Sequence, residues 1–308
     1  MNRPPVIGFI GVGLMGHGMA KNILTKGYPL VVLGHRNREP VEHLKSLGAR
    51  EATTPRELAA QCDIVHLCVT GSPQVEALLR GQNGDGQGVI ASARQGLIVI
   101  DCSTSNPVST LALGEELRAA GMTLVDAPLS RTPKEAEAGT LDTMVGADPE
   151  TFARIKPVIA CWATTINHLG PLGLGHKMKL VNNIVAMGYA ALYSEALAIA
   201  RKAGLSIEQF HAVLGAGRMR CGFYDTFMKW SVDHDPNAHQ FTIANAHKDM
   251  RYLASMANEA GAVNTLQAGV KNSFAAMEAA GQGARYVPML ADFIAGLNGL
   301  PAAADAKH

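Results

Sequence analysis

The sequence predicts an α/β protein, with an N-terminal domain built on a mostly parallel sheet and an all-α C-terminal domain. Short apolar runs alternate with stretches of helical spacing through the first half, which is typical of a parallel sheet with helices on both faces. After about Gly170 the chain reads as helical with no clear strand. Since 308 residues are long for a single core, we expect two domains, residues 1–170 and 171–308.

The predicted elements follow from hydrophobic periodicity. The expected strands are Val6–Ile10, Leu30–Leu33, Ile64–Val69, Ile98–Ile100 and Thr123–Val125, with edge strands at Asp142–Val145 and Thr165–Leu169. The expected helices between them are Met15–Thr25, Pro40–Leu47, Pro55–Ala60, Val75–Leu79 and Val108–Ala120. A long Ala-rich helix from about His176 to Lys202 then opens the second domain.

A glycine-rich turn joins the first strand to the first helix. Gly11, Gly13 and Gly16 form a G-x-G-x-x-G pattern in the strand-to-helix context that a dinucleotide fold requires. Gly11 permits the tight turn, Gly13 lets the backbone approach a pyrophosphate, and Gly16 lets helix and strand pack closely. The amides at the helix start suit a diphosphate. We expect a Rossmann-type nucleotide site that includes Leu14 and Met15; a purely structural turn is the alternative.

Composition excludes several classes of protein. A net charge of +1, without a stripe of Lys and Arg, gives no reason to expect nucleic acid as a partner. No run of eighteen uninterrupted apolar residues predicts a membrane span, and the first strand begins too early to leave room for a signal peptide. The five cysteines and eleven histidines lack metal-ligand spacing, so we expect no metal. A reducing cytoplasm fits this cysteine usage.

The region after the second strand bears on which dinucleotide binds. An acidic residue that grips the ribose 2′-hydroxyl is expected about twenty positions after the glycines, yet the chain has Gly34-His35-Arg36-Asn37-Arg38 there. Arg36, assisted by His35 or Arg38, is a ready partner for a 2′-phosphate. We therefore predict NADP, with NAD as the alternative. Basic residues in this position are also typical of an ordinary solvated loop without a ligand.

Three further segments carry a family resemblance. They are Asp126–Thr132 followed by Ala138–Gly146, Gly173–Asn183, and Phe241 shortly before Lys248-Asp249. Together with the N-terminal glycine turn they resemble the β-hydroxyacid dehydrogenase family, which includes 3-hydroxyisobutyrate dehydrogenase, tartronate semialdehyde reductase and 6-phosphogluconate dehydrogenase. The resemblance covers essentially the whole chain. It implies an NAD(P)-dependent dehydrogenase or reductase acting on CH–OH groups.

A lysine and two amides supply the predicted catalytic chemistry. Lys179, Asn182 and Asn183 share one face of a helix, where they can hold a carbonyl oxygen and deliver a proton to it. Taken alone, such a pattern is usually a solvated helix face. The resemblance implies that Lys179 is the general acid/base and that Asn183 is its catalytic partner; we place Asn182 in the substrate site.

Other residues are assigned mainly by resemblance. Asp101-Cys-Ser-Thr104 follows a strand at the edge where open α/β sheets bind ligands, and it also reads as a helix cap. The resemblance implies that Thr104 contacts the cofactor and that Ser103 contacts cofactor or substrate; we assign Ser103 to the substrate. It also implies that Val69 contacts the cofactor and that Lys248 reaches it from the second domain.

The predicted substrate loop departs from the family pattern. Most members have Ser-Gly-Gly where this chain has Ser130-Arg131-Thr132. Arg131 would bring a guanidinium fork suited to a carboxylate, sulfonate or phosphate, unless it bends away into solvent. The Arg-Thr pair resembles the sulfolactaldehyde reductase branch, although Ala186 stands where that branch offers a Ser hydroxyl. We expect Ser130, Arg131 and Thr132 to bind a small anionic aldehyde or hydroxy acid.

Two other functions remain open. One is a catalytically silent dinucleotide-binding module, and the other is an imine reductase on the same architecture; relatives of both kinds commonly lack the lysine found at Lys179. Within the main reading, a sulfolactaldehyde-type reductase competes with an enzyme of the 3-hydroxyisobutyrate or tartronate-semialdehyde type. The resemblance further implies a homodimer or homotetramer.

Overall fold

The structure is a computed structural model that describes residues 3–82 and 85–303. It divides the chain into two compact units, Met1–Lys179 and Leu180–His308. The division falls inside helix α8 (Leu174–Lys202), a few residues after the change in sequence character near Gly170. The reason is that the first turn of α8 is hydrogen-bonded to the sheet, as described below.

The N-terminal unit contains one nine-stranded sheet in the described residues, with strand order β3-β2-β1-β4-β5-β6-β8-β7, and β9 pairs with β8. The first six strands are parallel, which is the doubly wound arrangement of dinucleotide-binding domains. The strands are β1 (Ile7–Ile10), β2 (Leu30–Leu33), β3 (Arg50–Ala52), β4 (Ile64–Leu67), β5 (Ile98–Asp101), β6 (Thr123–Asp126), β7 (Leu129–Ser130), β8 (Leu141–Gly146) and β9 (Ala163–Gly170).

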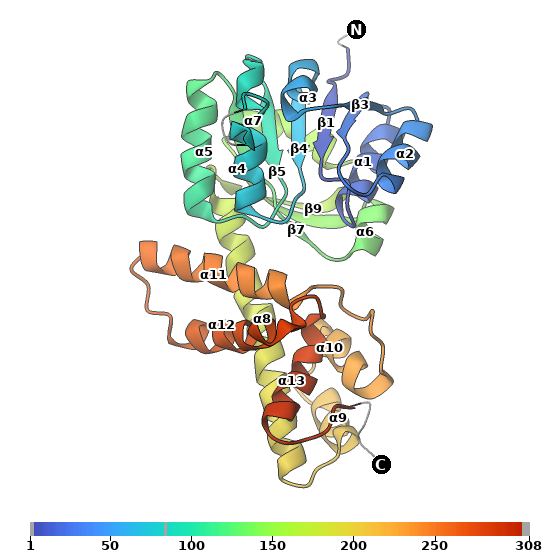
Figure 1. The fold of residues 1–308 in the computed structure, drawn as a ribbon, viewed down its shortest axis with the longest axis vertical. Coiled ribbons are helices and arrows are strands. Elements are labelled where there is room, and N and C mark those ends of the chain that lie inside the picture. Colours follow the sequence, from blue (N-terminus) through green and yellow to red (C-terminus); the bar gives the residue numbers. More distant parts are fainter. Residues whose placement is uncertain (1–2, 83–84, 304–308) are drawn as a thin grey trace. The chain divides into compact units, whose positions relative to one another are not determined.

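Helices cover both faces of this sheet (Figure 1). Apolar residues of α1, α2 and α7 pack in one core with Ile7 and Phe9, and those of α3, α4 and α5 pack in the other with Val6 and Ile10. The helices are α1 (Gly16–Thr25), α2 (Glu39–Ser46), α3 (Pro55–Gln61), α4 (Ser72–Arg80), α5 (Pro107–Ala119), α6 (Pro133–Ala138) and α7 (Pro149–Ile159). The central strands are buried on both sides, so their sequences read as continuous apolar runs.

Several helices start where side-chain caps and prolines dictate. Thr54, Asn106 and Asp148 each accept a hydrogen bond from a first-turn amide, and a proline follows each of them. Proline suits the first helical position because its missing N–H would have no partner there, and its φ is already helical. These caps and prolines mark the first turns of α3, α5 and α7.

The predicted fold class is confirmed, but five elements of the N-terminal unit had no prediction: β3, β7, α6, α7 and the three-residue 3₁₀ helix η2 (Ile90–Ser92). Strands β3 and β7 are too short and polar to show an apolar run, and α6 has only six residues. Helix α7 contains Pro157, which breaks a helical pattern on the sequence. The strand predicted at 142–145 is confirmed as β8, but its predicted place at the edge of the sheet was wrong, because β8 pairs with β6, β7 and β9.

In the C-terminal unit the described regular elements are all helices, and one isolated bridge joins Thr242 and Tyr286. Its helices pack around α8, whose residues Leu180, Met187 and Leu197 are buried in the core. The further elements are α9 (Ile207–Ala216), α10 (Gly222–Asp233), α11 (Ile243–Glu259), α12 (Thr265–Met277), the π-helix η3 (Glu278–Gln282), the 3₁₀ turn η4 (Val287–Met289) and α13 (Leu290–Leu297).

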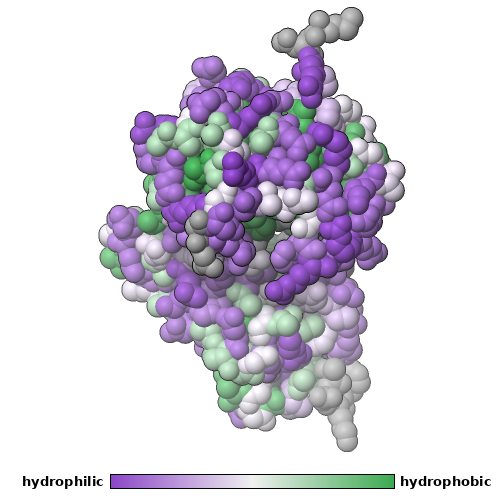
Figure 2. Space-filling view, turned by 45° about the horizontal axis from the view of Figure 1, so that its top comes forward, coloured by the Kyte–Doolittle hydropathy of each residue, from purple (hydrophilic) through white to green (hydrophobic). Residues whose placement is uncertain are grey.

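Helix α8 is long and apolar enough to cross a membrane by length and composition alone. Several apolar side chains of α8 are buried in the core of the C-terminal unit. Other apolar side chains of α8 remain exposed, among them Val185, Leu192 and Ile199. Figure 2 shows hydrophobic and hydrophilic residues interspersed over one face of the molecule.

Candidate functional site

The candidate site is built on the carboxyl edge of the parallel sheet. Ile10, Leu33, Leu67 and Asp101 are in register across β2, β1, β4 and β5, so the loops that follow these strands begin side by side. The order of strands reverses between β1 and β4, which is where open α/β sheets bind ligands. These loops contain the predicted residues Gly11, Gly13, Leu14, Met15, His35, Arg36, Val69, Ser103 and Thr104, and Gly16 opens the helix that follows the first loop.

The glycine turn has the geometry that a diphosphate requires. Gly11 has a φ of +98°, and a Cβ there would overlap the carbonyl oxygen of Cys68. A Cβ on Gly16 would overlap the Gly11 carbonyl, whereas Gly13 faces open space. The first helix has no side-chain cap at Met15 and no acidic residue in its first turn. No side chain therefore caps the backbone amides at its N-terminus. The turn therefore fits an anionic diphosphate group.

Of the three basic side chains in the loop after β2, two are exposed and unpaired among the described residues. His35 and Arg36 are exposed and have no hydrogen bond or ion pair within the described part of the chain. Arg38 instead contacts Glu51 (2.6 Å) and Glu42 (2.7 Å). Hydrogen bonds from Arg38 and Lys45 hold the pKa of Glu51 down, to about 2. Arg38 is therefore committed to a surface ion-pair network, and Arg36 is the cation available at this edge.

The loop after β5 is held by a buried carboxylate. Asp101 Oδ1 accepts from the Ser103 amide (2.9 Å), and Oδ2 accepts from the Ser105 hydroxyl (2.8 Å). Ser103 is buried, and its Oγ accepts from the Val69 amide (3.0 Å). The structure thus joins two predicted site residues, Ser103 and Val69, directly. Ser103 is used to connect loops, while Thr104 beside it is half-buried.

A second buried carboxylate, Asp126 at the end of β6, caps the long helix α8. Asp126 Oδ1 accepts from the Gly173 amide (2.8 Å), and Oδ2 accepts from the His176 amide (2.6 Å). Burial raises the pKa of Asp126, although His176 and these amides oppose the increase. A Cβ on Gly175 would overlap the Met144 carbonyl and crowd Asp126, so only glycine lets the helix start this close to the sheet. The contact fixes the turn that precedes Lys179.

The predicted catalytic residues occupy successive turns of α8. Lys179 is half-buried, Asn182 is exposed, and Asn183 is buried. The Asn183 amide nitrogen donates to Oδ2 of the buried Asp249 (2.6 Å), whose Oδ1 lies 3.1 Å from the Lys248 ammonium. Asn183 and Lys248 are therefore connected through a carboxylate to which the sequence attached no role.

The predicted substrate loop combines an unpaired hydroxyl with an arginine at positive φ. The Ser130 Oγ is buried and has no hydrogen-bond partner among the described residues. Arg131 has a φ of +85°, a conformation that favours glycine, and its Nε donates to Asp142 Oδ2 (2.7 Å). Burial alone would raise the pKa of Asp142, but the Arg131 hydrogen bond lowers it below the usual range. The Thr132 hydroxyl is used in a capping box with Glu135 at the start of α6.

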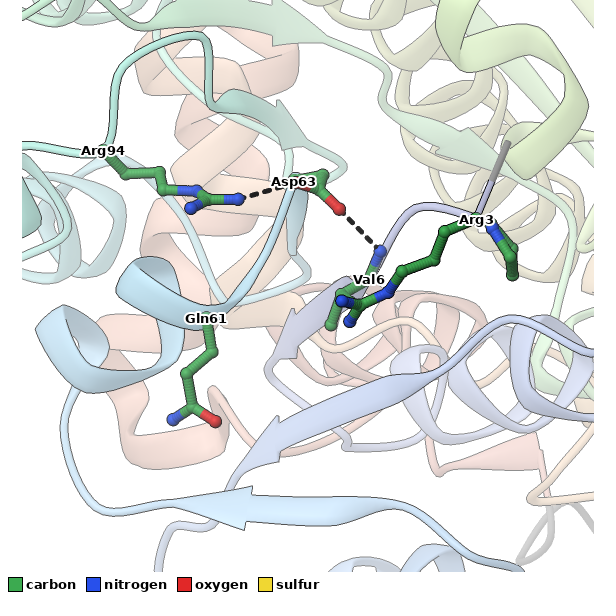
Figure 3. Close-up of a pocket in the computed structure, with 6 residues that line it drawn as sticks. Arg3, Val6, Gln61, Asp63 and Arg94 are labelled. Atoms are coloured by element: carbon green, nitrogen blue, oxygen red, sulfur yellow. Dashed lines mark hydrogen bonds and ion pairs between the residues drawn. The ribbon is translucent and has the colours of Figure 1, made fainter. Parts of the chain in front are cut away.

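A separate pocket of about 340 Å³ lies at the opposite edge of the sheet (Figure 3). It is lined by Arg3, Pro4, Val6, Gln61, Asp63 and Arg94. Val6 and Asp63 precede β1 and β4, so this pocket is at the amino ends of strands whose carboxyl ends carry the candidate site. Asp63 already binds the Val6 amide (2.9 Å) and Arg94 (2.8 Å). These contacts identify a strand anchor rather than a catalytic site.

Sequence reasoning gave no role to Asp126, His176, Asp142 or Asp249. One signal was available: Asp126 ends its strand as Asp101 does, one strand further along the sheet. The other pairings join residues far apart in sequence and leave no local pattern. Within the described residues, no group of three or more His, Cys, Asp or Glu side chains is arranged to hold a metal ion.

Comparison with known proteins identifies the family of both halves. Residues 6–170 match the NAD-binding domain of 6-phosphogluconate dehydrogenase. Residues 173–290 match the NAD-binding domain of NADP-dependent 3-hydroxyisobutyrate dehydrogenase. The first match alone spans more than half of the chain.

Individual relatives agree with these matches. The chain is 32% identical to 2-(hydroxymethyl)glutarate dehydrogenase of Eubacterium barkeri, over 85% of this chain and 84% of the relative. It is 30% identical to 3-sulfolactaldehyde reductase of Escherichia coli, over 90% and 91%. Among solved structures, 3-hydroxyisobutyrate dehydrogenase of Mycobacterium tuberculosis superposes with a TM-score of 0.82 at 25% identity, covering 95% of this chain and 99% of that one. The chain therefore belongs to the β-hydroxyacid dehydrogenase family of NAD(P)-dependent oxidoreductases, which act on CH–OH groups.

Proposed function

We propose that this enzyme interconverts a small anionic aldehyde and the corresponding hydroxy acid, with NADP as its preferred cofactor. The observation that carries the proposal is the anchored start of α8. It presents Lys179 and Asn183, one turn apart, just after the contact with Asp126 at the carboxyl edge of the sheet. The same edge holds the glycine turn that fits a diphosphate.

The chemistry divides between cofactor and chain. When bound, the nicotinamide would supply the hydride for reduction of the carbonyl carbon or take it up in oxidation of the alcohol. In the direction of reduction, Lys179 donates a proton to the carbonyl oxygen, so that one hydride and one proton convert C=O to CH–OH. In oxidation Lys179 accepts that proton. The Asn183 amide nitrogen donates one hydrogen to Asp249, and we assign its second hydrogen to the reacting oxygen. We assign Asn182, on the same helix, to the substrate.

Recognition of the substrate anion is assigned to the loop after β7. The Arg131 guanidinium is held at Nε by Asp142, which leaves its terminal nitrogens to form a fork toward a carboxylate or sulfonate. The Ser130 hydroxyl, which has no hydrogen-bond partner among the described residues, is assigned to the same anion. Thr132 is a weaker candidate because its hydroxyl already caps α6.

The cofactor assignment rests on charge at the end of β2. We assign Arg36, with His35, to the 2′-phosphate. The nearby acids Glu42 and Glu51 form ion pairs with Arg38. Leu14, Met15 and the glycines surround the diphosphate. Val69, Thr104 and Lys248 are assigned to the cofactor by family resemblance.

The cellular form is also a proposal. All five cysteines are free thiols, as expected for a reducing compartment such as the cytoplasm. The exposed apolar residues along α8, among them Val185, Leu192 and Ile199, fit a homodimer or homotetramer that covers them.

A spectrophotometric panel tests the function. Oxidation of NADPH and NADH is measured with small semialdehydes carrying a carboxylate or a sulfonate, and with cyclic imines. We expect aldehyde reduction with NADPH, and a fall in kcat of about 10²–10⁴-fold in Lys179→Met. Lys177→Met is the matched control, because Lys177 stands two residues earlier on a different side of the helix and should be dispensable.

Each alternative predicts a different result. Reduction of imines without reduction of aldehydes would favour an imine reductase. Tight NADPH binding without turnover of any substrate would favour a silent module. Full activity of Lys179→Met would remove Lys179 from the mechanism.

A further inference from the structure

A buried histidine outside the proposed chemistry connects the loops of the candidate site. His176, in the first turn of α8, is fully buried, and both nitrogens of its ring have partners. Nδ1 lies 2.8 Å from the Thr110 hydroxyl on α5, and Nε2 lies 3.1 Å from the Ser103 carbonyl oxygen. Fully buried histidines of this kind are held in one orientation by their hydrogen bonds.

The hydrogen-bond directions follow from the partners. A carbonyl oxygen only accepts, so Nε2 carries a proton and donates it to Ser103. Nδ1 forms the second hydrogen bond, with the Thr110 hydroxyl, which itself donates to the Asn106 carbonyl oxygen (3.2 Å). The backbone amide of the same residue donates to Asp126 (2.6 Å). His176 therefore binds the loop after β5, helix α5 and the end of β6 at once.

The residues next to these contacts are those assigned to the reaction. Thr104 directly follows Ser103, and Lys179 lies three residues after His176, less than one helical turn away. Ser103 in turn accepts from the Val69 amide in the loop after β4 (3.0 Å). A shift of His176 would therefore move the Val69 and Thr104 loops relative to the turn that carries Lys179.

We propose that His176 is a positioning residue for hydride and proton transfer, because it locks the Ser103–Thr104 loop to the first turn of α8. The proposal rests on the proposed role of Lys179. Catalytic rates are sensitive to such positioning, since a displacement of about 1 Å can cost about 100-fold. The charged contacts proposed for binding, Arg36 with the cofactor and Arg131 with the substrate, lie in other loops, so the loss should appear mainly in kcat.

Conservative variants separate the two contacts of the ring. The side-chain nitrogen of glutamine reaches about as far as Nε2, so His176→Gln can keep the bond to the Ser103 carbonyl. The asparagine amide reaches only about as far as Nδ1, so His176→Asn can keep the Thr110 contact but not the Ser103 contact. His176→Leu removes both. Val158→Ala, a cavity variant in the core of the same unit, controls for loss of stability alone.

Three measurements are made on each variant: steady-state kinetics, NADPH affinity by fluorescence titration, and hydrogen exchange of peptides covering residues 101–110. For His176→Leu and His176→Asn we expect faster exchange in this segment and a fall in kcat of about 10- to 100-fold. KM for the aldehyde and the Kd for NADPH should stay close to their original values. His176→Gln should restore slow exchange and most of kcat.

Other results would overturn the proposal. Unchanged kcat and exchange in His176→Leu would show that the ring positions nothing. A loss of kcat equal to that in Val158→Ala at equal stability, without rescue by glutamine, would show a purely structural role. If Lys179→Met keeps full activity, the proposed function fails separately, and the exchange data still report whether His176 holds the loop.

Discussion

Arg131 is an L-residue in a backbone conformation that favours glycine, beside a carboxylate that holds its guanidinium. A non-glycine residue with positive φ costs about 1 kcal/mol or more. Its ion pair with Asp142 is exposed and screened by solvent, so it offsets little of this cost. Strain of this kind persists at binding sites, which agrees with the substrate role proposed for Arg131.

Replacing Arg131 separates binding from stability. In Arg131→Gly the strain disappears together with the guanidinium, so we expect a KM at least about ten-fold higher for an anionic aldehyde. The midpoint of thermal unfolding should be unchanged or higher. Arg131→Ala should raise KM equally without the gain in stability. Unchanged KM in both variants would place Arg131 outside the substrate site.

Arg36 offers a test of cofactor choice at a single side chain. A charge-assisted contact with the 2′-phosphate contributes about 1.5–3 kcal/mol, so Arg36→Ala should weaken NADPH binding by about ten-fold or more. NADH lacks the phosphate, and its Kd should not change. Arg38→Ala is the control, since Arg38 is bound to Glu42 and Glu51. Equal weakening of both nucleotides in Arg36→Ala would contradict the assignment; fluorescence titration measures both.

At the scale of elements, helix α8 joins a closely packed start to an open middle. Gly175 leaves no room for a Cβ against β8 and Asp126, whereas a Cβ on Gly188 would meet nothing within 4 Å. Both glycines are in the same helix, so their intrinsic helix propensities are equal and only their surroundings differ.

This difference predicts opposite effects of one substitution. Gly188→Ala should raise the free energy of unfolding by up to about 1 kcal/mol, because alanine favours the helix. Gly175→Ala should lower it by about 1–3 kcal/mol and reduce kcat, because the start of α8 must move away from the sheet. Urea unfolding and steady-state kinetics of the pair test this. Equal effects at both positions would show that the contact with the sheet does not anchor the helix.

At the scale of the whole molecule, the sheet core contains a neutral histidine. His66 on β4 is fully buried, stacks on Phe9 with ring centroids 5.4 Å apart, and meets the edge of Trp162. Neither ring nitrogen has a hydrogen-bond partner within the described residues. Burial lowers the pKa of His66 to about 3.

This pKa makes stability depend on pH in a defined direction. Above pH 6.5 the residue is neutral in both folded and unfolded chains, so it has no effect. As pH falls from 6.5 toward 3, only the unfolded chain binds the proton, which costs about 2 kcal/mol of stability at pH 5. Between pH 7.5 and 5 His66→Phe should therefore lose about 2 kcal/mol less than the original protein in urea unfolding. His35→Gln, at an exposed histidine, should behave like the original; equal losses in all three would refute the assignment.

Sequence alone determined the alternation of strands and helices, the glycine turn, and the shared helix face of Lys179 and Asn183. Each of these features depends on residues close together in the sequence: on hydrophobic periodicity, on the conformational freedom of glycine, or on a spacing of three or four residues along a helix. Tertiary structure decided which partners those residues meet. Asp126 caps α8 from 50 residues away, and Asp249 holds Asn183 across 66. Such contacts join residues that only the folded chain brings together, and no local sequence pattern predicts which residues will meet.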